Sequence, residues 1–314
     1  MISRLTSVVS DSGRVTVLLS TYNGSRYLQQ QLDSLYAQTH PDIRILVRDD
    51  GSTDSTVAIL EGERAKGRIE LLEDRGNLGA TQSFFALLEH AAKTETDFVA
   101  FCDQDDVWLP EKVARAVAQL NKIPQGRAAL YCARAELVDE DLKHLGYTDQ
   151  PRRVGFGNAL VESIAAGCTM MLNRGALLLL AGRLPKHVYI HDWWCYLVVS
   201  CLGEVVYDEV PAIRYRQHRE NVIGVASEYE RYVKKYRRFF GSGEGRHWMS
   251  DQALLLRQIY ARNIAPDKLD LLELFIAGRT SLPRRVRLAL SCGIRRQRRS
   301  DDLLLRLLIV LNRY

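Results

Sequence analysis

The stretch "DFVAFCDQDDVWLP", residues 97–110, joins a short apolar run to three aspartates within four positions. An apolar run of this length that is closed by a polar cluster is typical of a buried strand ending at a functional edge. Asp103 and Asp105 alternate on an extended segment, so both can face one side and bind a divalent cation or a sugar-phosphate ligand. An Asp-X-Asp pair is common, and its meaning therefore depends on the rest of the chain.

The first 135 residues alternate strand-like and helical patterns. Four strand-like runs, at 15–20, 43–50, 69–73 and 97–103, are each followed by a helical pattern. A fifth strand-like run lies at 128–137. This alternation predicts an α/β fold with a mainly parallel sheet flanked by helices on both faces. Ligands of such sheets bind beyond the carboxyl ends of the strands.

Polar clusters follow four of these runs, namely "STYNGS", "DDGSTD", "DRGNLGA" and "DQDD". One such cluster would be explained by the turns and helix caps that any strand-to-helix loop requires. Four clusters on one edge, with this density of carboxylates, predict a ligand site. Neither GxxxxGK[ST] nor GxGxxG occurs, so a bound diphosphate would need a metal ion to neutralise it.

The composition is that of a globular protein that contains few features of an exported or membrane-spanning one. The chain has 314 residues with 46% hydrophobic content, enough for a large core. Its six cysteines show no CxxC pairing, which predicts reduced thiols and a cytoplasmic location. The first residues lack an apolar signal-peptide region, and no run approaches the ~20 apolar residues of a spanning helix.

The predicted C-terminal extension, residues 226–314, is helical and basic. Residues 281–314 contain nine arginines and two aspartates, a net charge of +7. Because the whole chain carries +5, the residues before 281 carry −2. Leucines lie between the arginines at 303–305, 307, 308 and 311. The pattern predicts an interfacial helix that binds an anionic membrane rather than nucleic acid. The alternative is that the leucines pack on the catalytic domain or on a second subunit of a homo-oligomer.

Six motifs together, in this order, resemble those of a known enzyme family. They are "LLSTYNGSRYLQQQLDSLYAQTH", "RDDGSTD", "DRGNLG", "DQDDVWLPEK", "HDWW" and "YRQHRENVIG". The chain resembles the family 2 nucleotide-sugar glycosyltransferases, in particular the rhamnosyltransferase-like branch that builds bacterial surface polysaccharides. The resemblance covers about residues 14–225. It implies a GT-A catalytic domain over residues 1–225, with a nucleotide-sugar half at about 14–135 and an acceptor half at about 136–225.

The resemblance also implies roles for individual residues. Asp50 would accept a hydrogen bond from the N3–H of a pyrimidine base, and Asp103 would contact the ribose. Asp105 and His218 would ligate Mg²⁺ or Mn²⁺ at the diphosphate. The remaining nucleotide-binding residues would be Thr21, Tyr22, Asn77 and Gly79.

Asp192 in "HDWW" falls where many relatives have the second residue of a Glu-Asp pair, the general base for the acceptor hydroxyl. A single displacement with such a base inverts the anomeric carbon. His191 replaces the usual Glu, so the role of that position is open. Trp193 and Trp194 would stack on the acceptor sugar or lie in the core, and Asp106 would cap the helix that begins near Pro110.

The leading hypothesis is an inverting glycosyltransferase that transfers one sugar per encounter to a saccharide or lipid-linked acceptor, with dTDP-L-rhamnose as the first donor to test. A sugar-phosphate nucleotidyltransferase is one alternative, but "STYNGS" is not the basic, Gly-rich loop of that class. A non-catalytic scaffold at the membrane surface is the other alternative. A processive synthase is disfavoured because "RQHREN" stands where such enzymes carry Gln-X-X-Arg-Trp.

Overall fold

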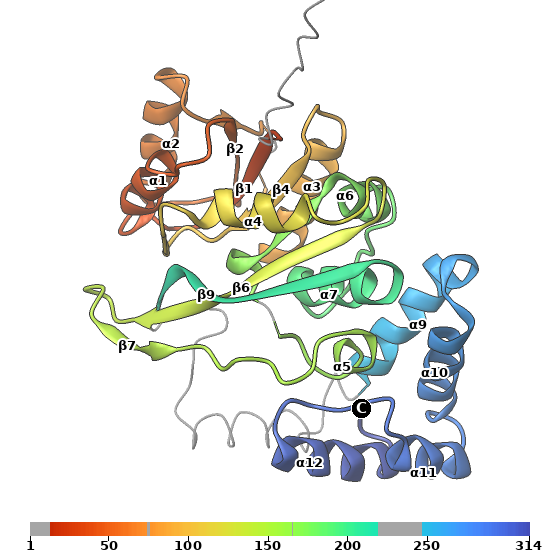
Figure 1. Ribbon diagram of the computed structural model, residues 1–314. Helices are drawn as coiled ribbons and strands as arrows, with labels where there is room; N and C mark the ends of the chain where they lie inside the picture. The colour runs from red at the N-terminus through yellow and green to blue at the C-terminus, as the bar shows by residue number, and fades with distance from the viewer. Residues whose placement is uncertain (1–12, 74–75, 165, 219–246) are drawn as a thin grey trace, which may run out of the picture.

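The computed structural model describes residues 13–73, 76–164, 166–218 and 247–314. In this part of the chain, helices pack on both faces of one twisted sheet, and four further helices lie beside it at the C-terminal end (Figure 1). The predicted α/β class, with a helical C-terminal extension, is confirmed. The predicted domain boundary at 225/226 lies outside the described residues.

The first four strands are parallel neighbours. Strand β1 (Val15–Thr21) lies between β2 (Ile43–Asp49) and β4 (Phe98–Cys102), and β3 (Glu70–Leu71) pairs with the far side of β2. The helices that connect them are α1 (Leu28–Tyr36), α2 (Thr56–Ala65) and α3 (Ala80–Ala92). Because parallel strands point the same way, their carboxyl ends meet at the edge where the sequence predicts a ligand.

The sheet has an apolar core on each face. Along β1, Val17 and Leu19 belong to one core and Leu18 to the other, because successive side chains of a strand point to opposite faces. All three side chains are fully buried. Burial on both faces explains why these strands are continuous apolar runs in the sequence.

The second half of the sheet mixes directions. Strand β6 (Ala129–Val138) pairs antiparallel with β8 (Met171–Asn173) and parallel with β9 (Glu204–Arg216), and β8 joins the first half through β4. Strands β5 (Val107–Trp108) and β7 (His144–Tyr147) complete the order β3-β2-β1-β4-β8-β6-β9-β5, with β7 beside β6. Strand β9 runs through Pro211 without a break, with a register shift against β6.

Four helices and a 3₁₀ turn accompany this half, and their bounds are Lys112–Leu120 (α4), Phe156–Ala159 (α5), Gly167–Thr169 (η1), Arg174–Leu180 (α6) and His191–Leu202 (α7). Asn173 caps α6, since its side chain accepts from the N–H of Ala176. Every residue of α7 from His191 to Cys201 is buried. A helix that is apolar on all sides belongs to the core, so α7 carries its first residues to a fixed position beside the ligand edge.

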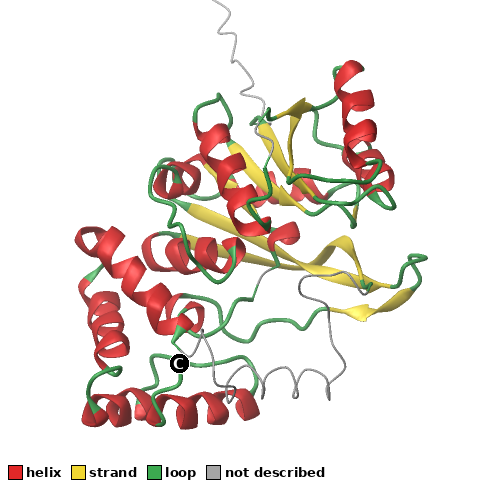
Figure 2. Cartoon of the chain, turned by 180° about the vertical axis from the view of Figure 1, so that it is seen from behind, coloured by secondary structure: helices red, strands yellow, loops and turns green. Residues whose placement is uncertain are grey.

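The C-terminal helices continue the core on the α7 side. They are α9 (Trp248–Tyr260), η2 (Ala261–Asn263), α10 (Pro266–Ala277), α11 (Leu282–Leu290) and α12 (Arg299–Val310). Leu256, Phe275 and Leu305 belong to the same buried cluster as Trp194 of α7. Helices α11 and α12 lie along one edge of the molecule, both in the first view and from behind (Figures 1 and 2). The extension therefore shares a core with the sheet domain instead of forming a separate unit.

Docking of the extension is also polar. The side chain of Asn158 donates to the carbonyl of Arg295 at 3.0 Å, and Arg296 Nη2 donates to the carbonyl of Val161 at 2.8 Å. A Cβ on Gly157 would meet the carbonyl oxygen of Gly293 at 1.8 Å, so the two segments touch backbone to backbone. Within the described ranges, no helix has both the length and the apolarity needed to cross a membrane.

Candidate active site

Loops that follow β1, β2 and β4 are held together at the carboxyl edge of the sheet. Thr21 Oγ1 donates to Asp49 Oδ1 at 2.9 Å, which joins the first loop to the second. The N–H of Tyr22 donates to Gln104 Oε1 at 2.8 Å, and Gln104 Nε2 donates to the Tyr22 carbonyl at 2.9 Å. A Cβ on Gly24 would meet Gln104 Oε1 at 2.0 Å. The side chain of Gln104 therefore packs directly on the glycine of "STYNGS", and a larger residue there would have to displace it.

Asp50 joins the loop after β2 to the loop that begins α3. Its Oδ1 accepts from the N–H of Leu78 at 2.7 Å and from Arg48 Nη1 at 2.5 Å, and its Oδ2 accepts from the N–H of Gly79 at 2.8 Å. These amides belong to the N-terminus of α3, where backbone donors have no helical partner and favour a carboxylate. The side chain is 3% exposed. Asp50 thus shapes the loop, and its predicted contact with a nucleotide base stays a prediction.

Four of the predicted nucleotide-binding residues differ in accessibility. Tyr22 is 49% exposed and Asn77 is also exposed, so both can contact a ligand directly. Gly79 is exposed and adopts a φ of 76°, a conformation that favours glycine. Thr21, in contrast, is 1% exposed with its hydroxyl turned to Asp49. The structure brings all four residues to one edge and gives Thr21 a supporting position there.

The two predicted metal ligands lie together. His218 Nε2 is 2.7 Å from Asp105 Oδ2, and both side chains are mostly but not fully buried. The tyrosine ring of Tyr27 lies 5.3 Å from the His218 ring, centroid to centroid. A carboxylate oxygen and an imidazole nitrogen fit Mn²⁺ well and Mg²⁺ less well, and the diphosphate of a nucleotide could supply the oxygen ligands that remain.

Arg216 fixes the backbone that carries this pair. Its backbone N–H donates to Asp106 Oδ1 at 3.1 Å, and its Nε donates to the carbonyl of Asp105 at 2.8 Å. Its guanidinium also donates to Gln30 Oε1 at 2.5 Å and to the carbonyl of Glu140. The side chain is buried. Arg216 therefore ties the "DQDD" loop to α1 and to the hairpin between β6 and β7.

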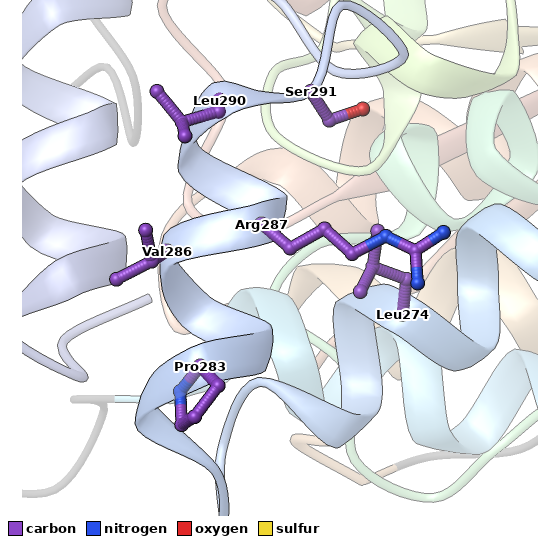
Figure 3. A pocket seen from close by; sticks show the side chains of 6 residues that line it. All are labelled: Leu274, Pro283, Val286, Arg287, Leu290 and Ser291. Atoms are coloured by element: carbon purple, nitrogen blue, oxygen red, sulfur yellow. The ribbon is translucent and has the colours of Figure 1, made fainter.

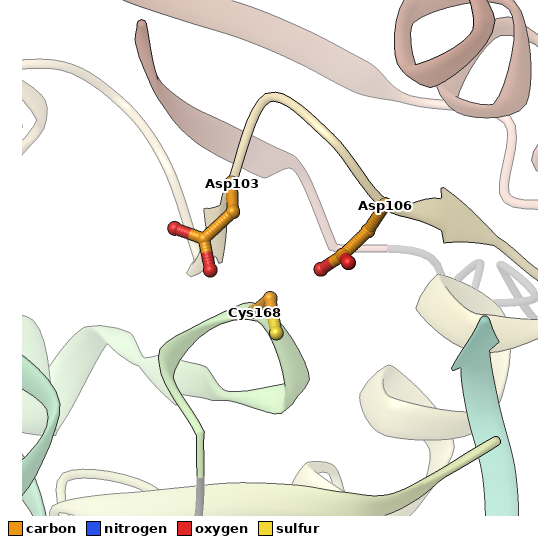
Figure 4. Close-up of side chains that lie close together, drawn as sticks. All are labelled: Asp103, Asp106 and Cys168. Atoms are coloured by element: carbon orange, nitrogen blue, oxygen red, sulfur yellow. The ribbon is translucent and has the colours of Figure 1, made fainter. Parts of the chain in front are cut away.

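A second cluster lies behind the "DQDD" loop. Ligand atoms of Asp103, Asp106 and Cys168 lie within 4.8 Å of one another, with the carboxylates turned towards the thiol (Figure 4). Burial raises the pKa of Asp106 and of Cys168 well above their usual values, and neighbouring aspartates raise them further. A buried, protonated thiol does not suit Mg²⁺ or Mn²⁺, which prefer oxygen ligands. This cluster fits a hard cation less well than the pair of Asp105 and His218.

Asp106 and Lys112 are both buried, although their positions in the sequence do not indicate burial. The prediction that Asp106 caps the next helix is wrong, because α4 begins at Lys112 with Glu111 before it and the Asp106 carboxylate is fully buried. Lys112 is 1% exposed, with its ammonium 3.4 Å from the centre of the Trp108 ring. Burial lowers the pKa of Lys112 to about 8.

Asp192 reaches the same edge from the start of α7. Its Oδ2 accepts from the N–H of Gly167 at 3.0 Å, its Oδ1 accepts from the N–H of Trp193 at 2.5 Å, and it is 8% exposed. Burial raises the pKa of Asp192 to about 6. Burial also raises the pKa of Asp103, and the charges of Asp105 and Asp192 add to that effect. The predicted base is therefore an electrostatic neighbour of the predicted ribose ligand.

His191 lies in an apolar pocket beside this base. Its ring stacks on Phe84 with centroids 4.1 Å apart and meets the edge of Phe101 at 5.1 Å. Both ring nitrogens are buried and have no hydrogen-bond partner among the described residues. Burial lowers the pKa of His191 to about 3, so the ring is neutral near pH 7. A Cβ on Gly167 would lie 2.7 Å from His191 Nε2, which explains the glycine at that position.

Trp193 and Trp194 are core residues. Trp194 has no exposed surface, so its predicted stacking on an acceptor sugar is wrong. Trp193 is 7% exposed, and its indole N–H donates to the carbonyl of Ala159 at 2.7 Å. Its ring meets Trp248 at 4.5 Å in an edge-to-face arrangement. Both residues face inward because α7 is buried on all sides, a property that the four-residue motif alone does not reveal.

The sequence reasoning missed several residues of this region, namely Gln104, Arg216, Cys168 and Lys112. Gln104 and Lys112 stand next to recognised positions, but nothing in their spacing indicates burial or a partner far along the chain. Arg216 bonds across 186 residues to Gln30. The available signal was the position of Arg216 in "YRQH", two residues before the predicted metal ligand.

Comparisons with known proteins identify the kind of protein to which this geometry belongs. The profile of the glycosyl transferase family 2 matches residues 16–177, about half of the chain. A dTDP-rhamnosyl transferase, RfbG of Shigella flexneri, is 26% identical over 233 residues, which are 69% of this chain and 77% of that protein. TuaG of Bacillus subtilis, a putative teichuronic acid biosynthesis glycosyltransferase, is 29% identical over 162 residues, 51% of this chain and 62% of that protein.

Solved structures share the fold. TarS of S. aureus, residues 1–349 in complex with UDP, superposes with a TM-score of 0.55 at 15% identity and covers 95% of this chain and 90% of that one. The mannosyltransferase PcManGT of Pyrobaculum calidifontis, in complex with GDP-Man and Mn²⁺, gives a TM-score of 0.51 at 19% identity, covering 96% and 86%. At these identities the likeness concerns the fold alone.

Proposed function

Because the chain belongs to glycosyl transferase family 2, we propose that it is an inverting glycosyltransferase. It moves one sugar from a nucleoside-diphosphate sugar to a saccharide or lipid-linked saccharide acceptor in bacterial surface polysaccharide synthesis. We assign the catalytic domain to residues 1–225 and the basic helical extension to 226–314. The observation that carries the proposal is the meeting of Asp103, Asp105, His218 and Asp192 at one edge, although they come from three distant segments.

The nucleotide would lie against the loops that follow β1 and β3. Tyr22 offers an exposed ring to the base, and Asn77 and Gly79 line the same side. Asp103, at the end of β4, is placed to contact the ribose. Thr21 and Asp50 hold these loops in shape through their hydrogen bonds.

Asp105 and His218 would hold Mg²⁺ or Mn²⁺. A cation there supplies positive charge to the leaving diphosphate, a role that Gly-rich phosphate loops play in other nucleotide-binding folds. Arg216 keeps the carbonyl of Asp105 in place. Because its guanidinium is bonded to Gln30 and Glu140, Arg216 acts on the loop and not on the phosphates.

Asp192 would take the proton of the acceptor hydroxyl as that oxygen attacks the anomeric carbon. The bond to the diphosphate breaks on the opposite face, so one displacement inverts the configuration. Burial raises the pKa of Asp192 to about 6, which makes it a stronger base than an exposed carboxylate and leaves it ionised at neutral pH. The N–H groups of Gly167 and Trp193 fix its orientation.

The donor proposed for the first test is dTDP-L-rhamnose, since RfbG is described as a dTDP-rhamnosyl transferase; UDP-sugars follow, since TarS was solved with UDP. We place the reaction in the cytoplasm, at the inner face of the cell membrane, where a lipid-linked acceptor would be available. The alternative is that the basic extension binds a second subunit in a homo-oligomer.

A thermal-shift panel of dTDP, UDP and GDP, each with and without Mn²⁺, tests the donor site. A nucleotide at 100 times its Kd should stabilise the protein by about 2.7 kcal/mol. Incubation with the matching nucleotide sugar should then release the nucleoside diphosphate. Binding of a nucleoside triphosphate with release of pyrophosphate would instead indicate a nucleotidyltransferase. Nucleotide binding without any turnover, across acceptors and in donor hydrolysis, would indicate a scaffold.

A further inference from the structure

The basic extension presents apolar side chains to solvent on two neighbouring helices. On α11, Leu282 is 54%, Val286 42% and Leu290 76% exposed. On α12, Leu303 is 69% and Leu307 is 51% exposed, and Leu311, which ends the helix, is 50% exposed. We call these six residues, with the arginines described below, the α11–α12 face. Isolated exposed leucines are ordinary, but six on two adjacent helices form a patch that calls for a partner.

The spacing shows that each helix has one such stripe. Leu282, Val286 and Leu290 are four residues apart, as are Leu303, Leu307 and Leu311, and this spacing places side chains on one face of a helix. The opposite faces are buried, through Leu288 and Ala289 on α11 and through three residues of α12, Leu305, Leu308 and Ile309. The leucines of the tail therefore divide between a packed side and a solvent side.

The same two helices also carry exposed arginines. Arg284 and Arg287 on α11 and Arg299 at the start of α12 are exposed, and none of their guanidinium groups has an ion pair or hydrogen bond with another described residue. Arg299 stands four residues before Leu303, on the same face of α12. Unpaired cationic groups beside exposed leucines are the composition of a helix that lies in a membrane interface.

A groove next to α11 has the same mixed character. It has a volume of about 540 Å³, and its lining includes Leu274 of α10 with Val286, Arg287 and Leu290 of α11. Figure 3 shows the Arg287 side chain extending over Leu274, while Val286 and Leu290 point to the other side of α11. The region therefore offers both apolar side chains and a guanidinium, on different sides of α11.

We propose that the α11–α12 face binds an anionic lipid bilayer, with its leucines among the acyl chains and its arginines at the phosphates. Charge favours lipid over a second copy of this chain. A two-fold interface sets a surface against itself, so Arg284, Arg287 and Arg299 would meet a surface that carries the same three arginines. A membrane with anionic headgroups supplies the opposite charge instead.

The position of the face suits this use. In both overall views, α11 and α12 form one edge of the molecule, away from α1 and α2 (Figures 1 and 2). Because the extension shares its core with α7, which carries Asp192, a bound membrane would hold the acceptor half at a fixed distance. The inference rests on the proposed function only for the choice of a lipid-linked acceptor, since membrane binding itself needs neither donor nor acceptor.

Co-sedimentation of the full chain with vesicles tests the proposal. Vesicles of phosphatidylcholine and phosphatidylglycerol in equal parts should sediment the protein at low ionic strength, and pure phosphatidylcholine should not. The triple substitution R284Q/R287Q/R299Q should weaken binding to anionic vesicles about 100-fold, because each arginine contributes about fivefold. The triple substitution L290S/L303S/L307S should weaken it about tenfold or more, since it removes the buried apolar contact.

A matched control removes the same charge elsewhere. R44Q/K93Q/K143Q changes three exposed cations outside the extension and should leave vesicle binding within about twofold. All three variants should keep the thermal midpoint and nucleotide binding of the parent, since every substituted side chain is exposed.

Two results would overturn the proposal. One is that the parent fails to sediment with anionic vesicles at low ionic strength. The other is that light scattering shows a parent dimer that the leucine variant dissociates while vesicle binding is unchanged, which would assign the face to self-association. Neither result bears on the glycosyltransferase reaction, because nucleotide binding and turnover are measured without vesicles.

Discussion

His218 Nε2 and Asp105 Oδ2 lie 2.7 Å apart, although 113 residues separate them in the sequence. Asp105 follows β4, and His218 follows the end of β9, the strand next to β5. The contact closes the loop after β4 against the far half of the sheet. This carboxylate and imidazole are the pair that we propose as the metal site.

Asp105→Asn should remove the dependence of nucleotide affinity on Mn²⁺ while the fold survives. The amide keeps the size of the side chain but loses the negative charge that a divalent cation requires. Calorimetry of nucleoside diphosphate with and without Mn²⁺ measures the effect, with Asp141→Asn, an exposed aspartate outside the site, as the control. Equal metal dependence in the parent and in Asp105→Asn would remove Asp105 from the metal site.

Arg216→Gln should weaken Mn²⁺-dependent binding about 10- to 100-fold, the usual effect of losing a residue that positions a metal ligand. The glutamine cannot bond to Asp105, Gln30 and Glu140 together, so the loop loses its anchor. The control is Arg214→Gln, two residues earlier on β9 with an exposed side chain. If both variants bound Mn²⁺ and nucleotide alike, Arg216 would have no positioning role.

Asp192→Asn should lower turnover by about 10²- to 10⁴-fold with nucleotide affinity nearly unchanged, since the amide cannot accept the acceptor proton. In the parent, kcat/KM should fall as the pH drops through about 6, because protonation of Asp192 removes the base. Steady-state rates across pH 5 to 8 measure both effects. Turnover within a few-fold of the parent would exclude Asp192 as the base.

The metal-free protein should lose stability as the pH rises from about 4 to about 6 through the titration of Asp192. Burial raises its folded pKa to about 6, above the unfolded value. The folded state therefore binds the proton more tightly, and deprotonation costs about 3 kcal/mol of unfolding free energy, present in full above pH 6. Denaturant unfolding at pH 4.5 and 7.5 measures it. Asp192→Asn should show a flatter pH dependence, and an unchanged slope would contradict the assignment.

His191→Phe should raise the free energy of unfolding by about 1 kcal/mol. The ring nitrogens of His191 are buried without partners, which costs desolvation energy, and phenylalanine keeps the stacking on Phe84. Urea unfolding compares the variant with His187→Phe at an exposed position, where no gain is expected. A loss of stability in His191→Phe would show that a polar partner of the ring exists in solution.

The α/β class and the sheet edge that carries the candidate site can both be predicted from local patterns in the chain. Continuous apolar runs such as Val15–Thr21 must be buried on both faces, and a polar cluster after each run must lie where parallel strands end. The same local pattern pointed to Asp103 and Asp105 as candidate ligands, whereas the role of Asp192 was predicted from the family resemblance. Periodicity and turn chemistry act over a few residues, so one sequence is enough to recognise them.

Packing between elements, in contrast, sets which side chains are accessible and which distant groups meet. Asp50 and Thr21 turn to backbone and side-chain partners instead of to solvent, and Trp194 is enclosed because α7 is buried on all sides. Arg216 acquires its role from partners on α1 and on the hairpin between β6 and β7. The tail leucines divide between core and solvent according to how α11 and α12 dock. Burial and long-range contacts depend on packing between elements, and no local pattern encodes how those elements approach one another.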